Sequence, residues 1–486
     1  MSAPSPISLR FGAGVENQVR SRIGYAFRVF AAIYNYRVVE ADSSEAAIWC
    51  LYGEVPPQER SSRHFHIPSR YQLRPLNSGA QSLVRHRYAG EEFHLFLGID
   101  KATGTPDWLG EIFTWISSSH ELSITGRDSV GRIPYHQMIF SKNGISPRKP
   151  YAILLMAWLD NSLRNGQTLE ALPKAPSPVP GVEHFVVCSH DIDFYYTTRS
   201  SALIRLLKNL GISFRLYRSW SYFSSNSRMI LQLLGGKRVG DYLPSLLATM
   251  QRCDVQSTLF VVPQRGHRRD PDYQLGDLVS HLSEASSKGF SVGVHGSYNS
   301  IIEARTLTPE VAALEKVLGR RPLGSRQHWL RFDRHEKLFE AVEDAELLFD
   351  STLGFAEVAG FRNGASFAFP PYDFEKEKPH EFLEIPLVLM DGNLEAASRT
   401  LGENPQVIAD EVLGQSRKWS WGGIAALWHN PMEPLSVPKE INRVFWNCAK
   451  NGQEHAEKWV SAEKFLAQCL GRYQDAGLMK GARIHA

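Results

Sequence analysis

Two aspartates separated by one residue follow an apolar run and could carry metal or proton chemistry. Asp191 and Asp193 belong to the segment SHDID at 189–193, directly after the apolar residues 185–188. Two carboxylates this close repel each other when both are ionised, and a bound divalent cation relieves that repulsion. Alternation in an extended chain sends both to one side, so one could bind a metal while the other takes a proton. The alternative is a solvated strand exit.

Three further segments with strand character end in titratable residues. His295 closes 291–295, Arg326 and His328 lie in 325–332, and His429 follows 424–428. In parallel (β/α) folds the C-terminal ends of the strands meet at one edge, where catalytic residues gather. A single histidine at a strand end is more often structural, but several such ends favour a common site.

These residue types suit a hydrolytic metal centre. Carboxylate and imidazole groups bind Zn²⁺ or a similar first-row cation, and a catalytic site needs only three protein ligands. Asp193 and His295 would supply two. Asp191 would accept the proton of the attacking water and His429 would protonate the leaving group. Arg326 could hold Asp191 ionised or stabilise an oxyanion.

The elements that would position these residues indicate two domains. From 184 onward, strands expected at 184–188, 256–262, 291–295, 325–332, 383–389 and 424–428 alternate with helices at 241–252, 275–288, 309–318 and 336–345. Such alternation predicts a parallel α/β sheet or barrel. Upstream, helices at 15–35, 109–116 and 151–164 with strands at 46–52 and 93–98 predict a smaller mixed α/β domain. Prolines in 174–181 mark a linker, so the predicted parts are 1–173, 174–181 and 182–486. A last helix is expected at 462–476.

Composition excludes several classes of function. The 486 residues include 54 basic and 51 acidic ones, a net charge of +3 that does not predict nucleic acid or an anionic membrane as the main partner. Five separated cysteines argue against a disulfide scaffold and a thiolate zinc site. We expect no transmembrane segment and no secretory signal, and therefore a cytoplasmic protein.

The ordered motifs resemble the polysaccharide deacetylase superfamily, carbohydrate esterase family four. The resemblance covers about 184–429 and rests on the Asp-x-Asp, TLFV at 258–261, GVHGS at 293–297, the Arg-bearing strand and LWH at 427–429. It implies a distorted parallel (β/α) barrel that removes acetyl groups from sugars with a divalent metal. It also implies that Asp191 is the base, Asp193 and His295 are metal ligands, Arg326 positions the base, His429 is the general acid and Asp391 tunes it. The N-terminal part is similar to an uncharacterised domain that precedes some bacterial members.

Two departures from the family pattern concern the metal. Here one residue separates aspartates that are usually adjacent, a pattern that a subgroup shares. Asn299 stands where a second histidine is usual, and asparagine is a poor ligand for Zn²⁺. His328 is our candidate replacement, because Arg326 and His328 should face the same side of one strand. The alternative is that His328 is a core residue and the metal site is broken.

Four residues are candidates for contacts with substrate. Arg362 lies in a Gly-rich loop and could bind an anionic group, or pair with Asp350 as a structural arginine. Trp220, in an insertion between the first two strands, could stack on a sugar or pack the insertion against the barrel. Tyr298 and Asn299 follow His295. The turn at 128–132 is interpreted as a plain turn.

The leading hypothesis is a metal-dependent hydrolase, using Zn²⁺ or alternatively Co²⁺ or Ni²⁺, that deacetylates an N-acetylated saccharide in bacterial envelope or exopolysaccharide synthesis. A second hypothesis is a glycan-binding or regulatory barrel that lost catalysis with the second histidine. A third is a hydrolase of a non-sugar amide. The position of His328 separates the first two. The sequence predicts a carbohydrate partner and leaves the oligomeric state open.

Overall fold

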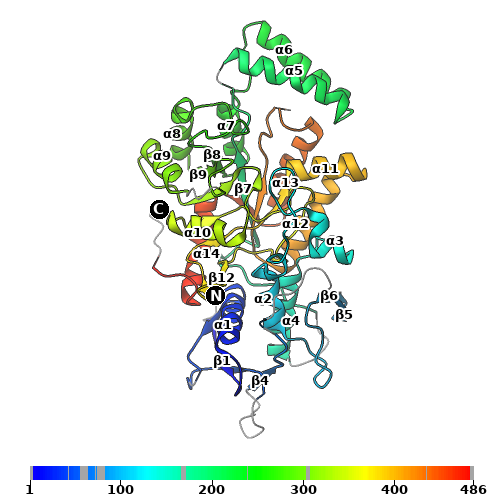
Figure 1. Ribbon diagram of the computed structural model, residues 1–486, viewed down its shortest axis with the longest axis vertical. Helices are drawn as coiled ribbons and strands as arrows, with labels where there is room; N and C mark the ends of the chain where they lie inside the picture. The colour runs from blue at the N-terminus through cyan, green and yellow to red at the C-terminus, as the bar shows by residue number, and fades with distance from the viewer. Residues whose placement is uncertain are drawn as a thin grey trace.

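A computed structural model describes residues 4–41, 43–54, 64–71, 73, 83–165, 171–196, 198–237, 239–302, 307–433 and 435–481. Viewed with its long axis vertical, the chain has a small sheet at the lower end, a barrel in the middle and a helical hairpin at the upper end (Figure 1). Within the described ranges, no helix is both long enough and apolar enough to cross a membrane.

The described strands are β1 (Ser5–Phe11), β2 (Tyr36–Val38), β3 (Ile48–Tyr52), β4 (His64–Ile67), β5 (Val84–Tyr88), β6 (Glu91–Leu95), β7 (His184–Asp191), β8 (Thr258–Val261), β9 (Ser291–Gly296), β10 (Gly324–Gln327), β11 (Phe349–Asp350), β12 (Tyr372–Asp373), β13 (Lys378–Pro379), β14 (Leu383–Glu384), β15 (Leu387–Met390), β16 (Gly422–Leu427) and β17 (Glu457–Val460).

The described α-helices are α1 (Asn17–Tyr34), α2 (Trp108–Ile116), α3 (Ile139–Asn143), α4 (Tyr151–Asn165), α5 (Arg199–Arg215), α6 (Trp220–Leu234), α7 (Leu243–Arg252), α8 (Val279–Ser287), α9 (Thr308–Leu318), α10 (His335–Asp344), α11 (Asp391–Leu401), α12 (Pro405–Trp419), α13 (Lys439–Glu454) and α14 (Ala462–Asp475). Short 3₁₀ turns are η2 (Ser119–Glu121), η3 (Tyr135–Gln137), η4 (Leu275–Leu278) and η5 (His328–Leu330).

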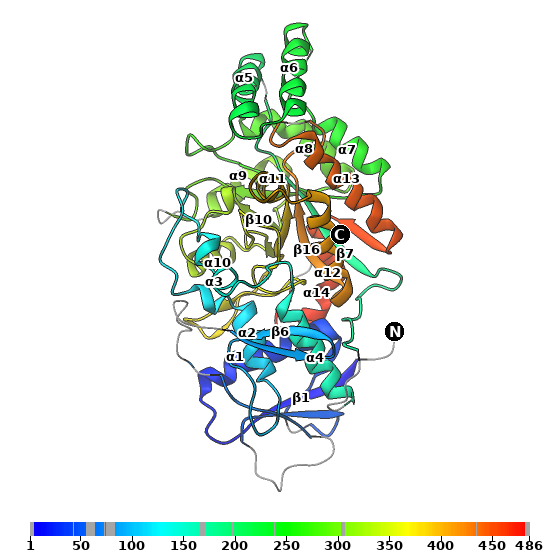
Figure 2. The ribbon, with the colours of Figure 1, turned by 90° about the vertical axis from the view of Figure 1, so that its right-hand side faces the viewer.

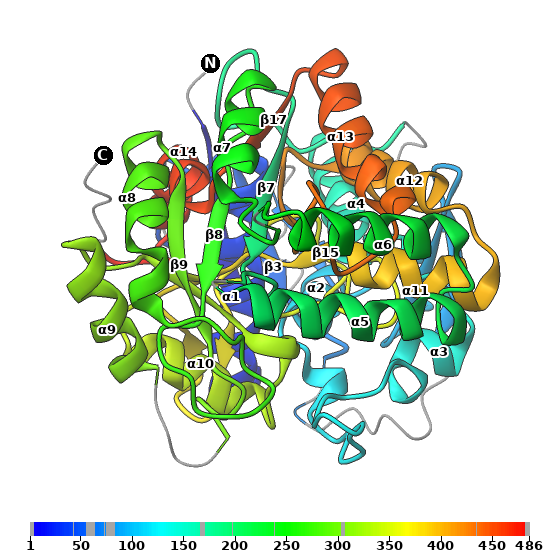
Figure 3. The same ribbon diagram turned by 90° about the horizontal axis from the view of Figure 1, so that it is seen from above.

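The larger sheet is a curled, all-parallel sheet in the order β14-β11-β10-β9-β8-β7-β16-β15, with β17 also paired to β7. A parallel bridge between Gly354 and Leu387 brings the segment after β11 against β15, so the two ends of the sheet meet. Helices α7 to α10 and α12 to α14 lie around it (Figure 3). The predicted distorted parallel (β/α) barrel is therefore confirmed.

The strand register aligns the C-terminal ends of β7, β9, β10 and β16. Arg326 pairs with His295 across β10 and β9, and Leu427 pairs with Ser189 across β16 and β7. These four strands are buried along their whole length, as expected where helices cover a parallel sheet. Polar groups at their C-terminal ends consequently face the same edge.

The N-terminal part is the mixed α/β unit that the sequence predicts, although the exact division at 174–181 remains a prediction. Its parallel sheet has the order β2-β1-β3-β4, and its core continues into the lower end of the barrel. The Trp421 indole donates to Ile33 O at 3.3 Å, and the Tyr25 hydroxyl donates to Pro370 O at 2.6 Å. Figure 2 shows this unit directly beneath the barrel.

Two local expectations need correction, and two elements were not expected. The strand expected over 325–332 ends at Gln327, because Trp329 and Leu330 have φ values of 66° and 52° and turn the chain. The strand expected over 383–389 is two strands, β14 and β15, separated by Ile385 and Pro386. The hairpin formed by α5 and α6, and the strand β17, were not anticipated.

Candidate functional site

Asp193, His295 and His328 form a cluster at the C-terminal edge of the barrel. One ligand atom from each lies within 4.8 Å of the others. Asp193 Oδ2 is 3.3 Å from His328 Nε2, and Asp193 Oδ1 is 3.6 Å from His295 Nε2. Two ligands of one cation with bonds of about 2.0–2.2 Å are separated by similar distances. The sequence placed all three at this site, and the structure brings them together.

Both imidazoles are oriented by a contact at their other ring nitrogen. His295 Nδ1 lies 2.9 Å from Arg326 O, and His328 Nδ1 lies 3.3 Å from Asp270 Oδ1. Such outer contacts fix the ring and the tautomer of histidines that bind metals. The two Nε2 atoms are thus the ones directed at Asp193.

The surroundings of Asp193 suit a carboxylate that binds a cation. Its Oδ1 is buried and has no hydrogen-bond partner among the described residues. Burial alone would raise the pKa of Asp193, but His328, His295 and His429 hold it well below its usual value. Burial would lower the pKa of His328, but Asp193 and Asp270 raise it to about 9. A carboxylate and two imidazoles fit a first-row divalent cation that replaces these protons.

Asp191 is fixed beside the cluster by Arg326. Arg326 NH1 donates to Asp191 Oδ1 at 2.9 Å and to Ser189 Oγ at 2.9 Å. The guanidinium is fully buried, donates further to Ser351 and lies 4.5 Å from the centre of the Phe260 ring. Asp191 Oδ2 lies 3.5 Å from His295 Nε2. The arginine therefore engages one carboxylate oxygen and leaves the other facing the cluster.

His429 and Asp391 form a second pair, in which Asp391 is buried and His429 is partly exposed. His429 Nδ1 lies 2.8 Å from Asp391 Oδ1, and the backbone N–H of His429 donates to Asp391 Oδ2 at 3.0 Å. Burial would lower the pKa of His429, but Asp391 and then Asp193 and Asp191 raise it to about 10. His429 Nε2 is 3.6 Å from Asp193 Oδ2, and the side chain is 21% exposed. It can therefore present a proton at the open side of the cluster.

The turn that carries His328 is strained and braced by the N-terminal part. Positive φ at Trp329 and Leu330 is costly for residues with a Cβ and persists only where the surroundings enforce it. Arg331 Nε donates to Val130 O at 2.7 Å, and Arg132 NH1 donates to Trp329 O at 3.3 Å. The segment 128–132 is thus a turn, as interpreted, and it contacts the loop of a candidate ligand.

The structure does not bring the four predicted substrate residues together. Arg362 is buried and forms a bidentate ion pair with Glu121 of the N-terminal part, rather than with Asp350. Trp220 is 73% exposed at the start of α6, where it packs on Phe214 and Phe223 of the hairpin.

Tyr298 and Asn299 are engaged by arginines beside the site. The Tyr298 hydroxyl accepts from Arg269 NH1 at 2.5 Å, and Asn299 Oδ1 accepts from Arg331 NH1 at 3.0 Å. Asn299 does not belong to the candidate metal cluster.

Sequence reasoning missed three residues that support the site: Asp270, Ser189 and Ser351. Asp270 lies in the loop after β8, between the strands that carry Asp191 and His295. Its position after a strand of the same edge is a usable signal, but nothing in its sequence surroundings points to His328. Ser189 and Ser351 are contacts of Arg326 that only the packed barrel shows.

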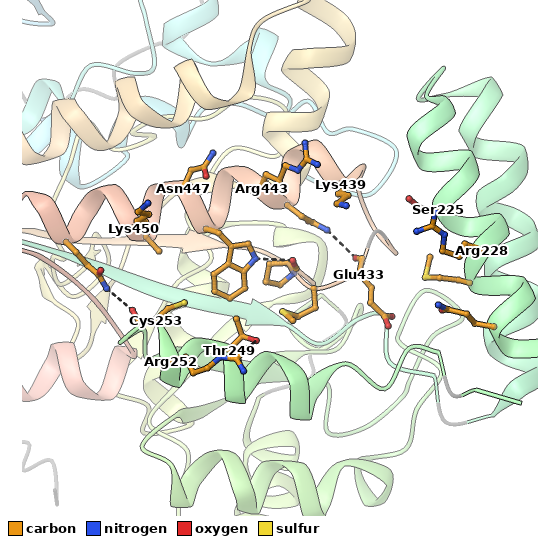
Figure 4. Close-up of a pocket in the computed structure, with 18 residues that line it drawn as sticks. Ser225, Arg228, Thr249, Arg252, Cys253, Glu433, Lys439, Arg443, Asn447 and Lys450 are labelled. Carbon is orange, nitrogen blue, oxygen red and sulfur yellow. Dashed lines mark hydrogen bonds between the residues drawn. The ribbon is translucent and has the colours of Figure 1, made fainter.

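A separate pocket of about 870 Å³ lies between α6, α7 and α13 (Figure 4). It is lined by Arg228, Arg252, Lys439, Arg443 and Lys450, with Glu433 as the carboxylate among its described lining residues. None of the clustered residues lines it. This pocket is therefore a basic surface feature and not the candidate metal centre.

Comparison with known families finds no family profile that matches the chain, and no curated protein matches it. Solved structures do. A PuuE allantoinase is 13% identical with a TM-score of 0.37, covering 66% of this chain and 97% of its own. A peptidoglycan N-acetylglucosamine deacetylase is 10% identical with a TM-score of 0.31, covering 59% and 90%.

The peptidoglycan deacetylase PdaC from Bacillus subtilis is 11% identical with a TM-score of 0.29, covering 60% of this chain and 95% of its own. The Xyl-CE4 domain of a multidomain xylanase from the hindgut metagenome of Trinervitermes trinervoides is also similar, at 8% identity and a TM-score of 0.28, covering 59% and 90%. Because every TM-score is below 0.5, the function of this chain has to be inferred from its own site.

Proposed function

We propose that the chain is a metal-dependent hydrolase that removes the acetyl group from an N-acetylated saccharide. The observation that carries the proposal is the convergence of Asp193, His295 and His328 beside the Asp191–Arg326 and His429–Asp391 pairs. Zn²⁺ suits this donor set, with Co²⁺ or Ni²⁺ as alternatives.

Asp193, His295 and His328 would hold the cation, and a divalent cation in such a site supplies Lewis acidity toward an acyl oxygen and a water molecule. Three protein ligands leave positions open for both. The unpartnered Oδ1 of Asp193 and the two outer contacts that orient the imidazoles support this assignment.

Two groups of the chain would move protons. Asp191 takes the proton of the attacking water on Oδ2, because Arg326 engages Oδ1 and leaves Oδ2 facing the cluster. His429 gives a proton from Nε2 to the departing amine, because Asp391 fixes Nδ1 and favours the imidazolium. The base thus lies at the end of β7, and the acid directly follows the neighbouring strand β16.

Acetate release from N-acetylglucosamine oligosaccharides by the metal-loaded full chain tests the proposal. Asp191→Asn should retain the metal and lose activity by at least about 100-fold, since only the base is removed. Asp193→Ala should lose both the metal and the activity. Asp272→Ala, at an exposed carboxylate paired with Arg265, is the matched control and should change neither.

The substrate class is tested separately by profiling. A metal-loaded chain that binds the oligosaccharide without releasing acetate would support the glycan-binding hypothesis. Hydrolysis of a small cyclic amide in place of any acetylated amino sugar would retain the metal mechanism and overturn the saccharide assignment.

A further inference from the structure

The hairpin of α5 and α6 leaves the catalytic edge of the barrel and has an unusual charge. It lies in the insertion 194–240 between β7 and β8. This insertion has none of the 51 acidic residues of the chain and eight of its 54 basic residues, which are Arg199, Arg205, Lys208, Arg215, Arg218, Arg228, Lys237 and Arg238. The remainder of the chain is consequently net acidic. The insertion 194–240 is therefore strongly cationic, although the chain as a whole carries a net charge of only +3.

Both helices of the hairpin expose an apolar stripe. On α5, Ile204, Leu207 and Phe214 are 56%, 53% and 49% exposed, and their spacing places them on one face of the helix. On α6, Trp220, Leu231 and Leu234 are 73%, 69% and 69% exposed, again at positions that share a face. Such stripes normally face a protein core or a binding partner.

The two stripes meet where α5 turns into α6. The ring of Phe214 contacts Trp220 with centroids 5.3 Å apart and Phe223 with centroids 4.8 Å apart. The faces that join α5 to α6 are different and partly polar, since Asn209 Nδ2 donates to Asn226 Oδ1 at 3.0 Å. The hairpin thus buries a mixed face between its own helices and exposes an apolar one, at the upper end of the molecule (Figures 1 and 2).

We propose that this apolar face docks on an anionic lipid bilayer. An amphipathic helix with large apolar side chains on one face and lysines and arginines beside it lies in a membrane interface, held by burial and by attraction to acidic headgroups. The exposed cations of the hairpin, Lys208, Arg215, Arg218 and Arg228, form no ion pair within the described part of the chain, so their charges are available to headgroups. The cationic pocket beside α6 adds to the local field (Figure 4).

Charge also disfavours the competing occupant, a second copy of the chain. Pairing two of these hairpins would bring two sets of cations together without intervening carboxylates, and like-charge contact opposes association. An anionic bilayer supplies the complementary charge over a wide area.

Docking would place the site close to the bilayer, because the hairpin is fixed to the loop after His429. Asn209 Nδ2 and the Tyr222 hydroxyl both donate to Leu435 O, at 3.2 and 3.3 Å. Phe194 contacts the His429 ring at 5.8 Å and the Arg205 guanidinium at 4.7 Å. The proposal does not depend on the reaction that the site performs.

Vesicle co-sedimentation of the full chain tests this proposal. We expect binding to phosphatidylcholine vesicles in which about a third of the lipid is phosphatidylglycerol, and little binding to pure phosphatidylcholine. Salt should weaken the binding. The double variant Leu231→Glu with Leu234→Glu should lower the bound fraction about tenfold or more, because two charges then enter the apolar face.

The double variant Leu401→Glu with Val407→Glu is the matched control, since these residues are 65% and 60% exposed on α11 and α12. It should bind the vesicles as well as the wild type, and both double variants should unfold at the same temperature. Equal binding by both double variants, or no binding by the wild type, would overturn the proposal. The proposal would also be overturned if the wild type were a dimer, and if Leu231→Glu with Leu234→Glu made it a monomer without changing vesicle binding.

Discussion

His295 and His328 reach the same cluster from two differently built regions. His295 lies within the regular strand β9, and a backbone carbonyl, Arg326 O, orients its ring. His328 lies in a turn after β10 that has positive φ at the next two residues, and a side chain, Asp270, orients its ring. The first position is set by the barrel itself, whereas the second depends on loops and on the N-terminal part. The metal site is therefore expected to be rigid on one side and adjustable on the other.

The largest effect should come from removing either histidine. His295→Ala and His328→Ala should each lower metal affinity by more than about 100-fold, because only two ligands then remain. Titration of the metal-free protein with Zn²⁺ measures this. His136→Ala, at an exposed histidine, is the control. Retention of metal by His328→Ala would mean that His328 is not a ligand and that the turn after β10 contributes nothing to the metal site.

A change at Asp270 should separate the two regions. Asp270→Asn should weaken metal binding about 10- to 100-fold, since the amide lacks the negative charge that faces His328 Nδ1. The amide also has only one oxygen, whereas Asp270 accepts from Tyr298 N on Oδ1 and from Gly266 N and His267 N on Oδ2. No side-chain substitution removes the equivalent contact of His295. Asp277→Asn, at a carboxylate that accepts from Gln274 N, should leave affinity unchanged. An unchanged affinity in Asp270→Asn would show that the turn holds His328 without it.

The brace from the N-terminal part should have a smaller effect. Arg331→Ala removes contacts to Val130 O and Tyr298 O and should lower metal affinity about three- to tenfold by loosening the turn. Arg334→Ala, at an exposed neighbour, is the control. A loss of affinity as large as that of Asp270→Asn would show that the contacts from the N-terminal part matter as much for metal binding as those within the barrel.

The smallest expected effect is a shift in pH dependence. Asp391 helps to raise the pKa of His429 to about 10. In the metal-free protein, the stability contributed by this pair is therefore present below about pH 6.5 and is lost as the pH rises through about 10. Asp391→Asn should move the basic limb of the pH–rate profile to lower pH by about one unit or more. An unmoved limb would show that His429 does not provide the acid.

The sequence was most informative where strands are regular. Asp191, Asp193, His295 and His429 could be assigned to one edge because apolar runs precede them and parallel strands align. The prediction that His328 is a ligand assumes an alternating strand over 325–332. The chain instead turns at Trp329, and His328 reaches the cluster from that turn. The assignment was useful although its geometry was wrong.

Long-range packing explains what could not be predicted. Arg362 pairs with Glu121, which lies 241 residues away and in the other part of the molecule, and no local pattern reveals that partner. The contact of Asp270 with His328 forms only when the loop after β8 folds over the turn that carries His328. The hairpin of α5 and α6 follows from the helical spacing of apolar residues in the insertion, a signal that its aromatic residues alone do not give.

A crystal structure of the Zn²⁺-loaded chain, with anomalous data at the zinc edge, tests the central claim most directly. The account predicts one peak bonded at about 2.0–2.2 Å to Asp193, His295 Nε2 and His328 Nε2, with Asp191 and His429 beside it. A peak without His328 among its ligands, or zinc bound elsewhere, would contradict the claim that this residue completes the site.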